Sequence, residues 1–160
     1  VGMKYLAVAS IQALIILGTL MLYYFADILS MGRGWSWIID TFPMFLTTMF
    51  CGVLLIVTYT SIGLALSSVS RGKFFPGIAL LAIILGTKTL AAIVEGLFDK
   101  SILYLISPYD SIAHVGQALI GANMMYEHPW VWSLVSVLAF NAISLYVLSV
   151  RVSSMEVTRE

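Results

Sequence analysis

Two long apolar runs that meet at a short basic turn constrain this chain more than any other feature. No charged residue occurs from Thr41 to Ser70, and from Phe74 to Glu95 only Lys88 interrupts the apolar sequence. About 20 apolar residues in an α-helix cross the roughly 30 Å hydrocarbon core of a bilayer, so each run is long enough to span a membrane. A turn as short as the one between the runs makes the two helices antiparallel neighbours.

Composition argues against a water-soluble protein. Of the 160 residues, 61% are hydrophobic and 10% are charged, with a mean hydropathy of +1.01, whereas soluble domains carry about 25% charged residues. The net charge is zero and no basic run occurs, so nucleic acid is not an expected partner. The single cysteine, Cys51, lies inside an apolar run, which argues against a disulfide or a Cys-rich metal site.

The apolar runs predict an all-α polytopic membrane protein, with a single transmembrane domain over 1–160. Four transmembrane helices are expected near residues 5–26, 43–69, 75–97 and 130–150. Pro43 suits the first turn of the second helix, where its missing N–H would be unpaired anyway. Residues 27–42 are therefore predicted to form a loop, with Trp35 and Trp37 at the level of the lipid headgroups.

The connection between the third and fourth helices, residues 98–129, is predicted to hold short outer helices that are re-entrant or interfacial. Its apolar stretches are too short to span a bilayer. Within it, Ser107-Pro108-Tyr109-Asp110 is typical of a helix start. Serine caps the free N–H groups, proline occupies the first position, and aspartate at the third position faces the positive end of the helix dipole.

The distribution of cations predicts a cell-membrane protein with both termini on the cytoplasmic side. Cations are enriched in cytoplasmic segments, and this topology puts five inside and two outside. The inner set is Lys4, Arg71, Lys73, Arg151 and Arg159, and the outer set is Arg33 and Lys100. Because the first residue is Val and no signal-peptide pattern precedes the first apolar run, we expect the chain to be the carboxyl-terminal part of a longer membrane polypeptide.

Lys88 is the first candidate for a functional residue. A lysine at bilayer depth costs roughly 2.5–3.5 kcal/mol on insertion scales. Either it extends to the membrane surface while its stem packs, or it lines a pathway or pairs with a carboxylate. Glu95 lies on the same helical face, about 10 Å along the axis. Lys88 and Glu95 are therefore candidates for a substrate pathway.

Small and polar residues also share one face of the second helix. Thr60, Gly63 and Ser67 recur at helical spacing. One interpretation is close helix packing, because small residues let a neighbouring backbone approach. The other is a polar stripe along a substrate pathway, with Thr60 and Ser67 as candidate lining residues.

Motifs for nucleotide binding and catalysis do not occur. The sequence has no GxxxxGK[ST], GxGxxG, HExxH, GxSxG or CxxC, so we expect no enzyme activity and no catalytic residue. His114 and His128 have no convincing partner pattern. We expect each to be structural or solvent-facing, and we expect no metal site.

Three patches give the chain a resemblance to the last four membrane helices of ABC-2-type transporter permeases. The segment from Tyr59 to Ser68, followed by Arg71, looks like the end of that family's fourth helix. Leu105-Ile106-Ser107-Pro108 is similar to its outer short-helix region, and Arg151-Val152 with Glu156-Val157 is similar to the tail of many of these permeases. Together with the topology, the resemblance covers nearly all of the chain.

The resemblance implies a permease-subunit portion of an ATP-driven transporter, which forms part of the translocation pathway. It implies a second permease half and separate ATPase subunits as partners, with ATP and Mg on the ATPase and no cofactor on this chain. It also implies an outer pair of short helices dipping into the membrane between the last two helices. Arg71 and Lys73 would lie near the ATPase as a minor contact. The alternative is a small four-helix membrane channel, or a scaffold subunit of a membrane complex.

Overall fold

The described part of the chain is built from helices alone. The computed structural model describes residues 2–70, 72 and 74–157, and these contain no strand. The helices are α1 (Gly2–Ser30), α2 (Trp35–Val69), α3 (Phe75–Phe98), the 3₁₀ helix η1 (Ser101–Ile106), α4 (Pro108–Ile120) and α5 (Trp130–Val157). Four stretches, Met3–Ser30, Trp35–Val69, Phe75–Phe98 and Trp130–Arg151, are long and apolar enough to cross a membrane. The prediction of an all-α polytopic membrane protein is therefore confirmed.

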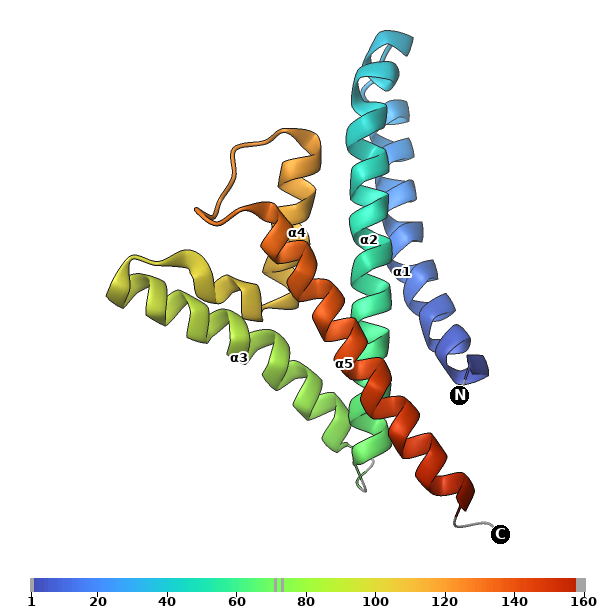
Figure 1. The fold of residues 1–160 in the computed structure, drawn as a ribbon. Coiled ribbons are helices and arrows are strands. Elements are labelled where there is room, and N and C mark those ends of the chain that lie inside the picture. Colours follow the sequence, from blue (N-terminus) through green and yellow to red (C-terminus); the bar gives the residue numbers. More distant parts are fainter. Residues whose placement is uncertain (1, 71, 73, 158–160) are drawn as a thin grey trace.

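Helix α2 is the centre of the arrangement, because it contacts α1, α3, α4 and α5. Figure 1 shows α1 and α2 as a long antiparallel pair, with α5 crossing α2 and α3 diverging from the end of α2. The chain then folds back along α3 through η1, and α4 packs against both α2 and α5. The start of α1 and the end of α5 lie toward the end of the molecule where α2 gives way to α3 (Figure 1).

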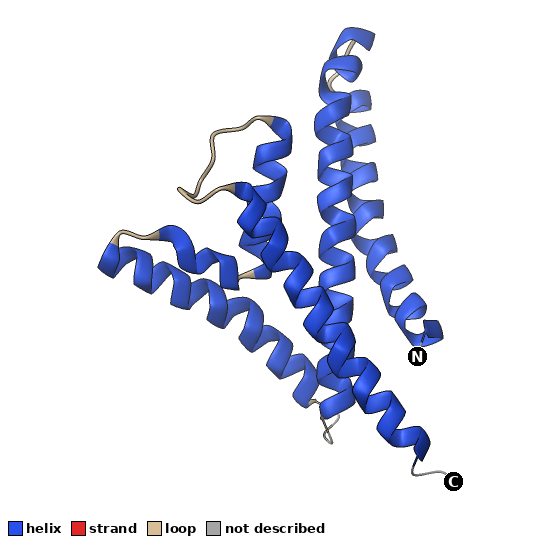
Figure 2. Ribbon diagram, viewed as in Figure 1, coloured by secondary structure: helices blue, strands red, loops and turns tan. Residues whose placement is uncertain are grey.

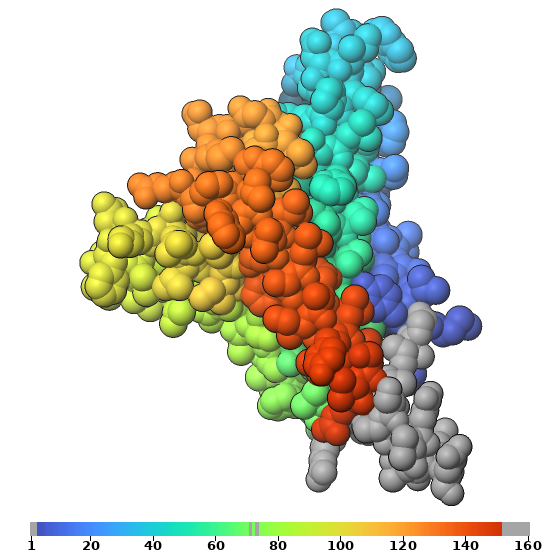
Figure 3. Space-filling model, viewed as in Figure 1, coloured from blue at the N-terminus to red at the C-terminus, as the bar shows by residue number. Residues whose placement is uncertain are grey.

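The connections between the helices are short, apart from the one before α5 (Figure 2). In the space-filling view, α3 and η1 project to one side and the α1–α2 pair rises above the rest (Figure 3). These projecting helices leave large apolar side chains exposed, such as Leu14 on α1 and Leu85 on α3. Exposed apolar faces of this extent are expected where lipid or another membrane helix is the neighbour.

The second membrane helix begins earlier than predicted. It starts at Trp35, so the expected loop over residues 27–42 is wrong, and Pro43 lies inside α2 rather than in its first turn. Only the turn after Ser30 separates α1 from α2. Packing against α1 extends to residues before the predicted start at Pro43, because Tyr24 stacks on Trp37 with ring centroids 5.9 Å apart and is hydrogen-bonded to Thr41 Oγ1 at 3.2 Å. This packing offsets the backbone hydrogen bond that a proline inside a helix removes.

The predicted short helices between the third and fourth membrane helices are confirmed as η1 and α4. The predicted start of α4 is also confirmed. Ser107 is its cap and accepts a 3.4 Å hydrogen bond from the Asp110 N–H, and Pro108 occupies the first helical position. Gly121 ends the helix in the left-handed conformation with φ of +67°, which a residue without a Cβ adopts at no steric cost.

Two glycines mark the closest helix contacts, and neither is the predicted one. A Cβ added at Gly52 of α2 would lie 3.0 Å from Leu17 Cδ2 of α1, and one at Gly116 of α4 would lie 3.0 Å from Cys51 Sγ of α2. At Gly63 an added Cβ would meet nothing within 4 Å. The close approach expected at Gly63 is therefore wrong, and the tight contacts are α1–α2 and α2–α4.

Candidate functional site

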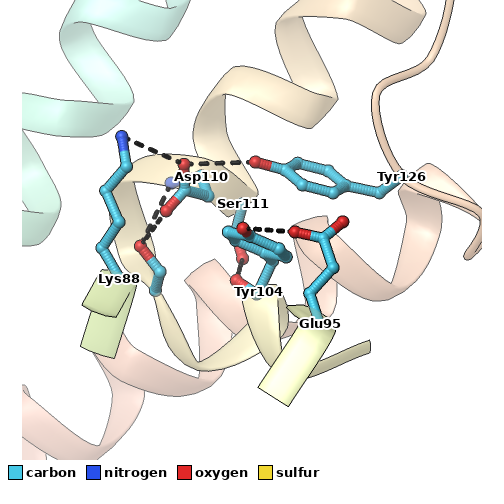
Figure 4. Close-up of polar contacts among 7 residues, drawn as sticks. Lys88, Glu95, Tyr104, Asp110, Ser111 and Tyr126 are labelled. Carbon is cyan, nitrogen blue, oxygen red and sulfur yellow. Dashed lines mark hydrogen bonds and ion pairs between the residues drawn. The ribbon is translucent and has the colours of Figure 1, made fainter. Parts of the chain in front are cut away.

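The main cluster of charged and polar side chains lies where α3, η1, α4 and the connection before α5 meet (Figure 4). We call it the polar centre. It consists of Lys88 and Glu95 from α3, Tyr104 from η1, Ser107 and Asp110 at the start of α4, and Tyr126 from the connection. Apart from Ser107 and Asp110, which lie in one helical turn, these residues are far enough apart in sequence that the fold is needed to bring them together.

Asp110 is the residue that the polar centre surrounds. Ser107 Oγ donates a 2.5 Å hydrogen bond to Asp110 Oδ2, and the Tyr126 hydroxyl donates a 3.2 Å bond to Oδ1. Lys88 Nζ lies 3.8 Å from the same Oδ1. The Asp110 side chain is only 6% exposed, whereas that of Lys88 is 56% exposed. A buried carboxylate is tolerated only where it is paired and hydrogen-bonded, and Asp110 has both kinds of partner.

Of the alternatives for Lys88, pairing with a carboxylate is the one seen in the structure, but the partner is not Glu95. Lys88 does have a carboxylate partner, but this is Asp110 on a different helix. Glu95 Oε2 instead accepts a 2.7 Å hydrogen bond from the Tyr104 hydroxyl. Two helical turns separate Lys88 from Glu95, about 10 Å, whereas η1 folds the chain back so that α4 brings Asp110 within reach. The Lys88 ammonium also lies 5.2 Å from the ring centre of Tyr109, which adds a cation–π contact.

Two stacked tyrosines join the two carboxylates of the polar centre. The rings of Tyr104 and Tyr126 lie 4.6 Å apart. Its hydrogen bond to Glu95 raises the pKa of Tyr104, with smaller contributions from burial and nearby negative charge. Burial raises the pKa of Tyr126, and the neighbouring Asp110 carboxylate raises it further. Both hydroxyls therefore stay protonated and act as hydrogen-bond donors at neutral pH.

A histidine pair continues the cluster toward α5. The rings of His114 and His128 lie 4.7 Å apart, and both are hydrogen-bonded to Ser133 Oγ, at 2.8 Å from His114 Nδ1 and 3.1 Å from His128 Nε2. Burial lowers the pKa of both histidines, and the neighbouring His128 lowers that of His114 further. Tyr126 contacts both rings, edge-on to His114 and stacked on His128.

The contact between His114 and His128 was not predicted from the sequence. His114 is fully buried, in line with a structural residue, but nothing in the sequence indicates that His128 and Ser133 are its partners. Their remaining ring nitrogens, His114 Nε2 and His128 Nδ1, are buried without a hydrogen-bond partner among the described residues. Ser133 is also fully buried, so a substrate could not reach the Ser–His contact.

Of the two predicted pathway residues on α2, neither belongs to the polar centre. Thr60 is buried and donates a 2.9 Å hydrogen bond to Gln12 Oε1 of α1. It also borders a cleft of about 240 Å³ among α1, α2 and the start of α3. Ser67 is exposed. Arg71 and Lys73, which are expected to contact the ATPase, lie outside the described residues. Their contact with the ATPase stays a prediction.

The polar centre lies beside the apolar part of α2. Ile112 of α4 has its carbonyl oxygen 3.9 Å from Cys51 Sγ. Along the helix axis, Cys51 is about 16 Å from Asp40 and about 28 Å from Ser70, which flank the uncharged run. The arrangement therefore places two carboxylates, an ammonium, two tyrosine donors and two neutral imidazoles among membrane helices. Within the described ranges, no group of three or more His, Cys, Asp or Glu residues could hold a metal ion.

Comparison of the chain with protein-family models, with curated proteins and with solved structures found no match. Function is therefore inferred from the helix arrangement and the polar centre.

Proposed function

We propose that this chain is the permease-subunit portion of an ATP-driven transporter of the ABC-2 type and forms part of its translocation pathway. The first support is the order of elements. Three spanning helices are followed by the short pair η1 and α4, and then by the last spanning helix, α5. The sequence resemblance to these permeases implies the same order, with short helices between the last two membrane helices.

The polar centre is the observation that carries the proposal. Ionisable residues among membrane helices are costly and commonly mark a substrate or ion pathway. Only the Asp110 carboxylate of the Lys88–Asp110 pair is buried, and burying a carboxylate costs free energy that an apolar side chain at this position would not. Lys88 and Glu95 are the predicted pathway residues that take part in this cluster. Thr60 borders a separate cleft, and Ser67 stands apart.

The proposal assigns nucleotide chemistry to partner subunits. ATP and Mg bind to separate ATPase subunits, because this chain carries no phosphate-binding loop. A second permease half completes the pathway, and the basic turn with Arg71 and Lys73 makes a minor contact with the ATPase. The protein lies in the cell membrane with both termini on the cytoplasmic side, as the cation distribution favours.

Purification of the full-length protein from its own membranes tests the proposal. A tag on the protein, with mild detergent, should bring down an ATPase subunit and measurable ATP hydrolysis. Replacing the phosphate-loop lysine of that ATPase should stop the hydrolysis without reducing recovery of the complex. If the protein is recovered without an ATPase and conducts ions across a bilayer in the absence of ATP, it is a channel, and the proposal is wrong.

A further inference from the structure

Side chains of α1 and α2 line a groove near the turn that joins the two helices. Figure 1 shows this end of the pair at the top of the view. It has a volume of about 410 Å³. Its walls are largely apolar and include the aromatic rings of Tyr23, Tyr24, Trp37 and Phe45. The groove is separate from the polar centre, which lies on the other side of α2 among α3, η1 and α4.

The aromatic wall of the groove is held in place by contacts between the two helices. Tyr24 of α1 stacks on Phe45 of α2 at 4.3 Å and on Trp37 at 5.9 Å. Its hydroxyl is hydrogen-bonded to Thr41 Oγ1 at 3.2 Å. The groove is therefore bounded by a preorganised aromatic surface, which lowers the cost of ordering it around a ligand.

One end of the groove carries a pair of opposite charges. The Asp27 carboxylate lines the groove, and Arg33 Nε lies 4.0 Å from Asp27 Oδ2. The Arg33 guanidinium also lies 5.0 Å from the ring centre of Trp37. This ion pair is at the outer limit of contact, and its side chains are 39% and 32% exposed for Arg33 and Asp27. Both charges are therefore accessible to a ligand that carries one charge of each sign.

The length of the groove matches one leaflet of a bilayer. Its lining on α2 runs from Trp37 to Thr48, a rise of about 16 Å, which is close to half of the roughly 30 Å hydrocarbon core. The charges and Trp37 lie at one end, and tryptophan and tyrosine favour the headgroup level of a membrane. The apolar part of the groove then runs beside the acyl chains of that leaflet.

We propose that this groove binds one phospholipid whose headgroup is phosphoethanolamine, with an acyl chain along the aromatic wall. The lipid ammonium pairs with Asp27 and the lipid phosphate pairs with Arg33. A primary ammonium donates hydrogen bonds to a carboxylate, which the quaternary ammonium of choline cannot do. A phosphoglycerol headgroup has no cation for Asp27. The charge pair therefore selects phosphatidylethanolamine over both.

Native mass spectrometry of bound lipid tests this site. The full-length protein is equilibrated in detergent with equal amounts of phosphatidylethanolamine, phosphatidylcholine and phosphatidylglycerol. We expect retention of one phosphatidylethanolamine in preference to either competitor by about tenfold, the effect of one charge-assisted hydrogen-bonded pair. Asp27→Asn should abolish the preference for ethanolamine, and Arg33→Gln should weaken retention of all three lipids.

Matched variants separate a specific site from general lipid coating. Asp40→Asn removes an exposed carboxylate on α2 that does not line the groove, and it should leave the preference unchanged. Thr48→Trp places a bulky ring at the apolar end and should displace the lipid while Asp27 and Arg33 remain. Equal retention of the three lipids, or a preference that survives Asp27→Asn, would mean an annular lipid only and would overturn the proposal.

Discussion

The Lys88 ammonium on α3 lies 3.8 Å from the Asp110 carboxylate on α4. The cation that interrupts the third apolar run is therefore directed at the short helix that precedes the last membrane helix (Figure 4). Ser107 and Tyr126 complete the surroundings of Asp110. Since the carboxylate is buried and the ammonium is half exposed, the two partners should respond differently to substitution.

The first prediction concerns the stability of this pair. Asp110→Ala should lower the free energy of unfolding by about 2–4 kcal/mol, because it leaves two buried hydroxyl donors without their acceptor. Lys88→Met should cost about 1 kcal/mol or less, because an exposed ammonium gains little from pairing. Chemical unfolding in detergent measures both. Additive costs in the double variant would show that the two residues do not interact.

The second prediction concerns the contact between α2 and α4. Gly116→Ala should destabilise the protein by about 1–3 kcal/mol, because the new methyl lies 3.0 Å from Cys51 Sγ in a packed interface. Cys51→Ala should relieve most of this cost when it is added. Gly86→Ala on α3 is the control, since its Cβ would meet nothing within 4 Å, and it should be neutral or stabilising by up to about 1 kcal/mol. Equal effects of the two glycine changes would contradict the packing described.

The third prediction concerns pH. The pKa values of His114 and His128 are lowered from 6.5 by burial. Below about pH 6.5 the unfolded chain therefore binds protons that the folded chain does not, and the free energy of unfolding should fall as the pH drops. The unfolding temperature should be lower at pH 5.5 than at pH 7.5 by several degrees, at about 2–4 °C per kcal/mol.

Two variants isolate the histidine contribution. Replacing both histidines with glutamine should reduce the difference between the two pH values. Ser133→Ala removes the hydroxyl that both rings share but keeps their titration, so it should lower the unfolding temperature at both pH values. A pH dependence that is unchanged in the double glutamine variant would assign it to other groups.

The fourth prediction concerns topology. In a Cys51→Ser background, Gly72→Cys should be labelled by a membrane-impermeant thiol reagent only after the membrane is opened. Met125 is 72% exposed. In the same background, a cysteine at this position (Met125→Cys) should be labelled from outside in intact cells. The cation distribution predicts this pattern. The reverse pattern would place the termini on the outer side.

The four membrane helices could be predicted because span length and apolarity are local properties of the sequence. The start of α4 could also be predicted from the sequence, since Ser107 and Pro108 act on backbone groups within one turn. The start of α2 could not be predicted in the same way, because Pro43 suits a first turn as well as a tolerated interior position. The contacts of Tyr24 with Trp37 and Thr41, which precede Pro43, favour the interior position.

The partners within the polar centre could not be predicted for a related reason. Helical periodicity relates only residues on one helix, so Glu95 was the only candidate partner for Lys88 that it could indicate. Asp110 reaches Lys88 because η1 folds the chain back along α3. His114 meets His128 and Ser133 across a connection whose path no local rule specifies. The ionisable residues were identified from the sequence, but their partners required the fold.

The most direct test of the proposed function is the ATP hydrolysis rate of the full-length protein with its ATPase, in lipid nanodiscs, with Lys88 changed to Met. The account predicts normal insertion, unchanged ATPase content and a hydrolysis rate lowered about tenfold or more, because the Lys88–Asp110 pair joins α3 to α4 within the cluster that the proposed function assigns to the translocation pathway. Asp110→Asn should lower the rate similarly, and the double variant should be no worse than either single one. A normal rate in correctly assembled Lys88→Met protein would contradict a role for this pair in transport.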